Sequence, residues 1–234
     1  MSGHAAGAQS KTRSTNETRE VEIRAGKVTL KGDLTIPDNP TSVVLFAHGS
    51  GSSRHSPRNK LVASTIREAG LGTLLFDLLT PTEEYVDALT RQLRFDIGLL
   101  AERLVNATYW LEGELDQLRI GYFGASTGAA AALVAAAEVG TIAGAVVSRG
   151  GRPDLASDSL PLVKAPTLLI VGSLDESVIQ LNRRAYAELQ CEKEISLIEG
   201  ASHLFEEPGT LDQVARLAAS WFQRYLTKVR KVVP

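Results

Sequence analysis

The chain has 234 residues, of which 44% are hydrophobic, and a formal net charge of −2 at pH 7. This length suits one sizeable core, and the composition is typical of a soluble globular protein. The near-neutral charge excludes the positive field that attracts nucleic acid or an anionic membrane, and no apolar run approaches the ~20 residues of a membrane span.

The first 18 residues are small and polar, lack the apolar stretch of a secretory signal, and are expected to form a disordered tail. Residues 19–234 contain no low-complexity linker, so we predict a single domain there. Cys191 is the only cysteine, which excludes an internal disulfide and a cysteine-rich metal site. We therefore expect a cytoplasmic protein with no metal, no cofactor, and neither nucleic acid nor membrane as a partner. The sequence leaves the oligomeric state open, homo-oligomers included.

Apolar residues alternate over Glu20–Ile36, which predicts two strands joined by a turn at Ala25-Gly26. The apolar run Val43–Ala47 is typical of a strand buried on both faces. Ser56-Pro57 begins a helix that Gly70 ends. Further strands are predicted over 71–78, 118–123, 142–147, 166–171 and 193–198, and helices over 93–113, 127–138 and 178–189. The last helix begins with a capping-box pattern of Thr210 and Gln213. Residues 80–91 form a polar stretch, and residues 149–161 are expected to form a loop with at most one helical turn.

Strands that alternate with helices of about 10–15 residues indicate an α/β fold with a mostly parallel sheet covered on both faces. The first two strands have no helix between them, so we expect them to add an antiparallel edge.

A lone serine lies between two glycines in Gly124-Ala125-Ser126-Thr127-Gly128, after a predicted strand and before an alanine-rich helix. A sharp strand-to-helix turn holds one side chain at the carboxyl edge of the sheet, and glycines there avoid clashes. The pattern predicts a nucleophile elbow, although a glycine-rich turn with no catalytic role can have the same sequence pattern. The P-loop and the dinucleotide fingerprint are excluded, because position 129 is Ala and the glycines fall at 121, 124 and 128.

A serine nucleophile needs a base, and the base needs an orienting acid. Asp175 and His203 each follow a predicted strand, in the chain order Ser, acid, His that this elbow uses. Taken alone, Asp175 also fits a helix N-cap and His203 a loop residue with a packing role. Their joint placement predicts a catalytic triad of Ser126, Asp175 and His203, with Asp154 as the rival acid.

Two backbone N–H groups are expected to form the oxyanion hole. One belongs to Thr127, directly after the nucleophile. The other comes from the loop after Val43–Ala47, where Ser50 is the first choice and Gly51 the next. In that loop we expect His48 to form a local hydrogen bond and His55 to line the site.

Several stretches resemble the dienelactone-hydrolase-like branch of the α/β-hydrolase superfamily: FAHGSGSSRHSPRN, LLFDLLT, GYFGASTGAAAAL, VVSRGGRPDLA, LLIVGSLDESV and ASHLFEEPG. The resemblance spans about Val21 to Tyr225. It implies a twisted, mostly parallel eight-stranded sheet without a large cap domain, and it places Ser126, Asp175 and His203 at the family's triad positions. Members are sometimes joined to a phosphoribosyltransferase domain, and we identify none in this sequence.

One departure from the family concerns the nucleophile. Dienelactone hydrolases use cysteine at the elbow, whereas this chain has Ser126, and Cys191 is far from the elbow in sequence. Lactone specificity is therefore not carried over, and a general carboxylester hydrolase fits better.

Four arginines follow strands or loops at the predicted catalytic edge: Arg54, Arg58, Arg149 and Arg152. They are interpreted either as a cationic rim that selects a carboxylate- or phosphate-bearing ester, or as partners of Asp77, Asp154 or Glu206 that hold loops together. The residues predicted to bind substrate are Gly51, Arg54, His55, Arg149 and Arg152.

The sequence thus predicts a serine hydrolase that cleaves small-molecule esters or lactones through an acyl-enzyme, in an open site suited to short acyl chains. A non-catalytic binding module of the same fold and an acyltransferase that uses the same acyl-enzyme are the alternatives.

Overall fold

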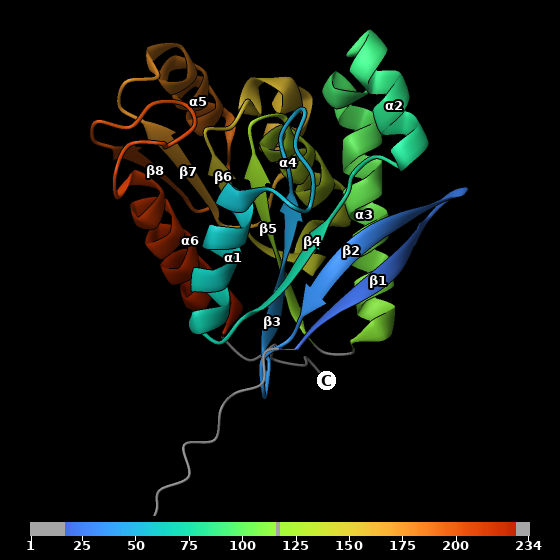
Figure 1. Cartoon of the computed structure of the whole chain (residues 1–234). Helices are drawn as coiled ribbons and strands as arrows, with labels where there is room; N and C mark the ends of the chain where they lie inside the picture. The colour runs from blue at the N-terminus through green and yellow to red at the C-terminus, as the bar shows by residue number, and fades with distance from the viewer. Residues whose placement is uncertain (1–16, 116–117, 228–234) are drawn as a thin grey trace, which may run out of the picture.

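An eight-stranded sheet forms the centre of the computed structural model, which describes residues 17–115 and 118–227 (Figure 1). The strand order is β1-β2-β4-β3-β5-β6-β7-β8. β2 pairs antiparallel with both β1 and β4, and every other neighbouring pair is parallel. The predicted mostly parallel sheet with an antiparallel edge is confirmed. The strands are β1 (Thr18–Ala25), β2 (Val28–Thr35), β3 (Ser42–Ala47), β4 (Gly72–Phe76), β5 (Arg119–Ala125), β6 (Ala143–Arg149), β7 (Thr167–Gly172) and β8 (Lys193–Ile198).

The predicted tail of residues 1–18 falls mainly on residues 1–16, which lie outside the described residues. β1 already begins at Thr18, where it pairs with Thr35 of β2, so the ordered chain includes the last residue assigned to the tail.

Helices cover both faces of the sheet, as predicted (Figure 1). α1 (Pro57–Glu68) and α6 (Thr210–Leu226) pack on one face, and α3 (Ile97–Glu114), α4 (Thr127–Val139) and α5 (Glu176–Glu188) pack on the other. Short 3-10 segments connect them: η1 (Leu93–Phe95), η2 (Gly140–Ile142) and η3 (Pro153–Leu162).

Each face of the sheet has its own hydrophobic core, because side chains alternate along a strand. In β6, Ala145 and Val147 belong to the core under α1 and α6, whereas Val146 belongs to the core under α3, α4 and α5. Arg149 continues the spacing of Ala145 and Val147, so its side chain lies on the α1–α6 side at the carboxyl end of β6.

Residues 80–91 form a helix that the sequence analysis did not predict, α2 (Pro81–Thr90). Thr80 and Glu83 make a complete capping box, and Pro81 occupies the first turn. Only Asp87 of this helix is buried, and Tyr85 is 70% exposed. The helix therefore lacks the apolar stripe by which amphipathic helices are recognised.

The predicted capping box at the start of α6 is wrong. Gly209 is the N-cap, at φ 77°, and no side chain caps this helix. The Thr210 hydroxyl instead donates to the carbonyl of Glu207 at 2.7 Å.

Candidate active site

Ser126 occupies a sharp turn between β5 and α4, with φ 52° and ψ −121°. This conformation is unfavourable for any residue with a side chain, so the surrounding bonds must hold it. The Ser126 N–H donates to the carbonyl of Arg149 at 3.2 Å, and its carbonyl accepts from Ala129 and Arg152 at 3.1 Å each. The backbone of the turn is thus fixed from three directions.

The two glycines of the elbow allow β3, β5 and α4 to approach closely. A Cβ on Gly124 would lie 2.4 Å from the Cα of Ala129, and a Cβ on Gly128 would lie 2.2 Å from the carbonyl oxygen of Ala47. Both distances are shorter than any real contact of a Cβ. The glycine spacing in the sequence therefore reflects backbone packing around the serine.

Asp175 and His203 meet at the carboxyl edge of β7 and β8. His203 Nδ1 lies 2.6 Å from Asp175 Oδ2. Asp175 begins α5 but makes no capping hydrogen bond with its side chain, which leaves the carboxylate for the imidazole. With Nδ1–H donated to the carboxylate, the neutral ring presents Nε2 as an acceptor, the form that a general base needs.

The imidazole of His203 lies beside the elbow. Arg149, whose carbonyl binds the Ser126 N–H, is followed by Gly150 at φ 51°. A Cβ on Gly150 would be 3.6 Å from His203 Cε1 and 3.2 Å from the His203 carbonyl oxygen. Within the described residues no hydrogen bond joins the Ser126 hydroxyl to His203, and such bonds often tighten only when substrate binds.

Ser50 and Thr127 come together on the other side of Ser126. Their hydroxyl oxygens lie 3.0 Å apart, and the Ser50 hydroxyl donates to the carbonyl of Arg94 at 3.3 Å. A Cβ on Gly49 would lie 3.1 Å from the Cβ of Ser126, so this loop touches the elbow. Among the described residues no protein group accepts from the backbone N–H of Ser50 or of Thr127. Both N–H groups are thus available to a ligand.

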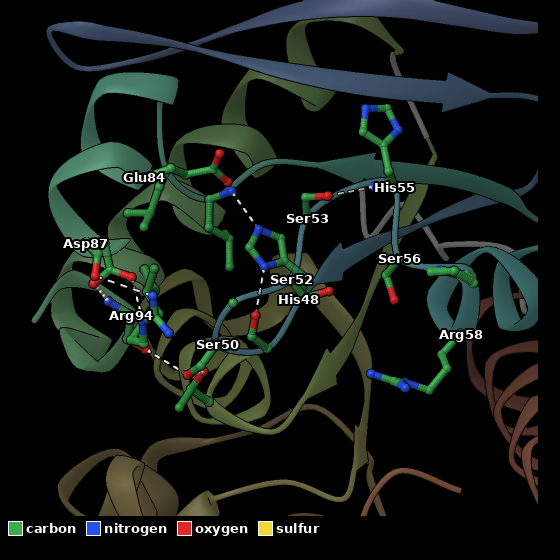
Figure 2. Close-up of a pocket in the computed structure, with 17 residues that line it drawn as sticks. His48, Ser50, Ser52, Ser53, His55, Ser56, Arg58, Glu84, Asp87 and Arg94 are labelled. Atoms are coloured by element: carbon green, nitrogen blue, oxygen red, sulfur yellow. Dashed lines mark hydrogen bonds and ion pairs between the residues drawn. The ribbon is translucent and has the colours of Figure 1, made fainter. Parts of the chain in front are cut away.

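His48 anchors the same loop. Its Nε2 accepts from the N–H of Leu78 at 3.1 Å, and its Nδ1 donates to the carbonyl of Gly49 at 3.1 Å (Figure 2). Because Nε2 accepts a hydrogen bond, the ring must be neutral, and burial lowers the pKa of His48 below its ordinary 6.5. His48 therefore holds the loop in place.

A cavity of about 600 Å³ runs along this loop from α2 to the start of α1 (Figure 2). Its wall is rich in hydroxyl groups and also contains a few leucines and charged side chains. Thr127 and Gly49 connect it to the elbow. The lining residues are His48–Ser53, His55–Arg58, Leu78, Leu79, Glu84, Asp87, Arg94, Leu100 and Thr127.

The predicted substrate-binding residues have different surroundings. Gly51 and His55 line the cavity, and Gly51 turns at φ 66°. Arg54 donates from its backbone and side chain to Asp77, and Arg152 makes two bonds to Asp154 at 2.9 and 2.8 Å. Arg149 is buried. The rival acid Asp154 is thus paired with Arg152, whereas Asp175 is paired with His203.

Sequence reasoning missed the wall that α2 and the start of α3 contribute. Asp87 accepts from Arg94 at 2.6 Å, and both line the cavity with Glu84 and Leu100 (Figure 2). The capping-box residues Thr80 and Glu83 were the available signal for this helix.

In the described part of the chain, no helix is both long enough and apolar enough to cross a membrane.

Two curated relatives, from two strains of Mycobacterium tuberculosis, carry the name "Putative phosphoribosyl transferase" and are 57% identical over 209 residues. The match covers 88% of this chain but 46% of each relative, so the chain spans about half of their length.

Solved structures with similar folds include a dienelactone hydrolase from Anabaena variabilis. It is 59% identical, has a TM-score of 0.88, and the match covers 90% of this chain and 98% of that one. Est1E from Butyrivibrio proteoclasticus has a TM-score of 0.74 at 15% identity, over 88% of this chain and 98% of that one, which shows a shared fold. Residues 31–232 match the dienelactone hydrolase family, and the chain belongs to this family of α/β-hydrolases.

Proposed function

We propose that this chain is a serine hydrolase that cleaves carboxylic esters through an acyl-enzyme on Ser126. The observation that carries the proposal is the 2.6 Å bond between His203 Nδ1 and Asp175 Oδ2, at the same edge as the strained serine. A turn that keeps a side chain at positive φ beside an oriented imidazole is typical of a nucleophile and its base.

In the first step, His203 Nε2 takes the proton of the Ser126 hydroxyl as its oxygen attacks the ester carbonyl carbon. The carbonyl oxygen becomes an oxyanion, which the N–H groups of Thr127 and Ser50 bind. Asp175 stabilises the imidazolium. The bond to the alcohol oxygen then breaks, and Nε2 returns its proton to that oxygen, which leaves the acyl-enzyme.

In the second step, His203 Nε2 takes a proton from water, and the hydroxide oxygen attacks the acyl carbonyl carbon. The same two N–H groups hold the second oxyanion. Collapse breaks the bond to Ser126, whose oxygen regains the proton from Nε2, and the carboxylic acid is released. An alcohol in place of water would give acyl transfer by the same route.

The substrate class in this proposal is short-chain esters and lactones. Four serine hydroxyls line the cavity against three leucines, which favours small polar substrates over long alkyl chains. The segment after β6 forms η3, which packs against α4 and α5 and is too short for a helical lid. Hydrolysis is preferred over phosphoribosyl transfer, because the 209 matched residues span the Ser126 elbow of this chain and leave about half of each mycobacterial relative unmatched.

A fluorophosphonate probe tests the nucleophile directly. The wild type should be labelled, Ser126→Ala should not, and Ser64→Ala, a serine on α1, should be labelled as the wild type is. A panel of p-nitrophenyl esters from acetate to octanoate, with simple lactones, then tests the substrate class. Labelling of Ser126→Ala, or a preference for long-chain emulsified triglyceride, would contradict the proposal.

A further inference from the structure

The four arginines that the sequence places at the catalytic edge differ in their partners. Three of them have carboxylate partners, as one of the two interpretations expected: Arg54 with Asp77, Arg152 with Asp154 at 2.8 Å, and Arg58 with Glu206 at 3.5 Å. Arg149 is the exception, and it is the most enclosed of the four, at 5% exposure.

Among the described residues, the side chain of Arg149 makes no hydrogen bond or ion pair, and its Nε is fully enclosed without a partner. A buried charge without a counterion loses several kcal/mol of hydration, so nearly all buried charges in proteins are paired. Its one favourable partner in residues 17–115 and 118–227 is the ring of Phe205, whose centroid lies 5.7 Å from the guanidinium carbon. A cation–π contact of this kind recovers about 1–2 kcal/mol, less than the hydration that is lost.

A second guanidinium stands close by. Burial and, to a smaller extent, the positive charge of Arg58 together lower the pKa of Arg149 to about 10, so the two cations repel each other. With a pKa of about 10, Arg149 remains charged at pH 7. Within the described part of the chain, the two arginines have one counterion, the carboxylate of Glu206, whose side chain is 65% exposed. The Nε of Arg58 is also enclosed without a partner. Two guanidiniums and one exposed carboxylate leave an excess positive charge there.

The backbone of Arg149 lies next to the reacting groups, and its guanidinium lies over the ring of Phe205, two residues after His203. Arg149 pairs with Ala125 across the sheet, and its carbonyl binds the Ser126 N–H. The next residue, Gly150, packs against His203. Arg58 lines the cavity, and its side chain extends from the start of α1 into the open region beside the loop (Figure 2). An anion that met both guanidiniums would therefore belong to a molecule bound at the elbow.

We propose that Arg149 and Arg58 form an anion subsite, which binds a carboxylate or phosphate group on the alcohol part of the ester. The anion is assigned to the alcohol part because His203 protonates the leaving alcohol in the proposed mechanism, and Gly150, the residue after Arg149, packs against His203. Two guanidinium groups offer the paired donors that these planar or tetrahedral anions prefer. The inference rests on the proposed function, because that mechanism decides which side of the site holds the alcohol part of the ester and which holds the acyl part.

The kinetic test compares a neutral ester with two anionic ones that carry the charge on the alcohol part. Phenyl acetate is the neutral substrate, and 4-carboxyphenyl acetate and 4-acetoxyphenyl phosphate are the anionic ones. In Arg58→Gln and Arg149→Gln, kcat/KM should fall about 10–100-fold for the better anionic ester and less than about 3-fold for phenyl acetate. Arg149→Lys should keep part of the preference. Arg67→Gln, on the same helix as Arg58 but at its far end, should change neither.

A binding test needs no turnover and separates this inference from the proposed function. Phenyl phosphate should raise the Tm of the wild type and of Ser126→Ala, but not of Arg58→Gln, whose side chain is partly exposed and tolerates substitution. Benzoate is tested in the same way, and whichever of benzoate and phenyl phosphate raises the Tm more shows whether the subsite prefers a carboxylate or a phosphate. A Tm shift that survives in Arg58→Gln and Arg149→Lys alike would overturn the subsite. So would an equal loss on charged and neutral esters, or a charge preference confined to acyl-side anions such as p-nitrophenyl succinate. Failure of the wild type to hydrolyse any ester would instead contradict the proposed function.

Discussion

Gly128 is the position where one added methyl group tests the architecture of the elbow most directly. In Gly128→Ala the new Cβ would lie 2.2 Å from the carbonyl oxygen of Ala47 and 2.4 Å from that of His48. Ordinary contact begins at 3.4 Å, so α4 and the end of β3 must separate by about 1 Å. Because the clashing atoms are backbone, no side-chain rotation relieves the overlap.

Overpacking typically costs 1–3 kcal/mol, and backbone clashes stand at the upper end, so we expect a loss of about 3 kcal/mol. For a chain of this size that loss lowers Tm by about 6–12 °C. Ala47 and His48 lead into the loop of Ser50, so the folded fraction should also lose about 10²–10³-fold in esterase rate as an oxyanion donor moves away.

Gly113→Ala is the matched control. Gly113 lies in α3, is exposed, and its added Cβ would meet nothing within 4 Å. The same substitution should therefore stabilise the protein by about 0.5–1 kcal/mol, since alanine is the better helix former. Thermal unfolding and p-nitrophenyl acetate hydrolysis measure both variants. The reasoning is refuted if the Tm of Gly128→Ala lies within about 1 °C of that of the wild type and its rate of ester hydrolysis is unchanged. In that case the close approach of α4 to β3 is not what positions the serine.

Three further predictions concern the acid, the loop histidine and a structural arginine. Asp175→Asn should lower kcat by about 10⁴-fold through loss of the oriented imidazole, whereas Asp154→Asn should change it less than about 3-fold; steady-state kinetics on both variants would expose a wrong choice of acid. Because burial lowers the pKa of His48 below 6.5, the unfolded chain binds a proton below that pH that the folded chain excludes. Its contribution to stability is complete above pH 6.5 and falls by up to about 1.4 kcal/mol per pH unit below it. Urea unfolding at pH 5.5 and 7.5 should show that the free energy of unfolding depends less on pH in His48→Gln than in the wild type. An equal pH dependence in the two proteins would refute this account. Arg54→Ala leaves Asp77 without its half-buried partner and should lower the free energy of unfolding by about 2–4 kcal/mol with unchanged ester preference, measured by urea unfolding and the ester panel.

The sheet and the elbow were predictable because their signals are local and redundant. Unbroken apolar runs such as Val43–Ala47 mark buried parallel strands, and the chain order of Ser126, Asp175 and His203 places three side chains after three strands. Strand polarity then brings them to one edge without knowledge of the loops between.

α2 and the partners of the arginines were harder to predict for physical reasons. α2 is held by polar contacts, Glu83 to Arg103 at 2.9 Å and Asp87 to Arg94 at 2.6 Å, so hydrophobic periodicity does not reveal it. The choice between a cationic rim and loop-holding ion pairs depends on side-chain directions, which spacing along the chain does not encode. Arg54 is paired with Asp77, whereas the Nε of Arg149 is enclosed without a partner among the described residues, and nothing in their sequence positions distinguishes the two.

The positive φ of Ser126 has a consequence for the stability of the fold. A backbone held in that region costs on the order of 1–3 kcal/mol with any side chain, and glycine alone avoids the penalty. Ser126→Gly should therefore raise the free energy of unfolding, although it removes the hydroxyl group. In the proposed mechanism that hydroxyl is the nucleophile, so the strained turn gives up part of the free energy of folding to fix the position of one oxygen atom.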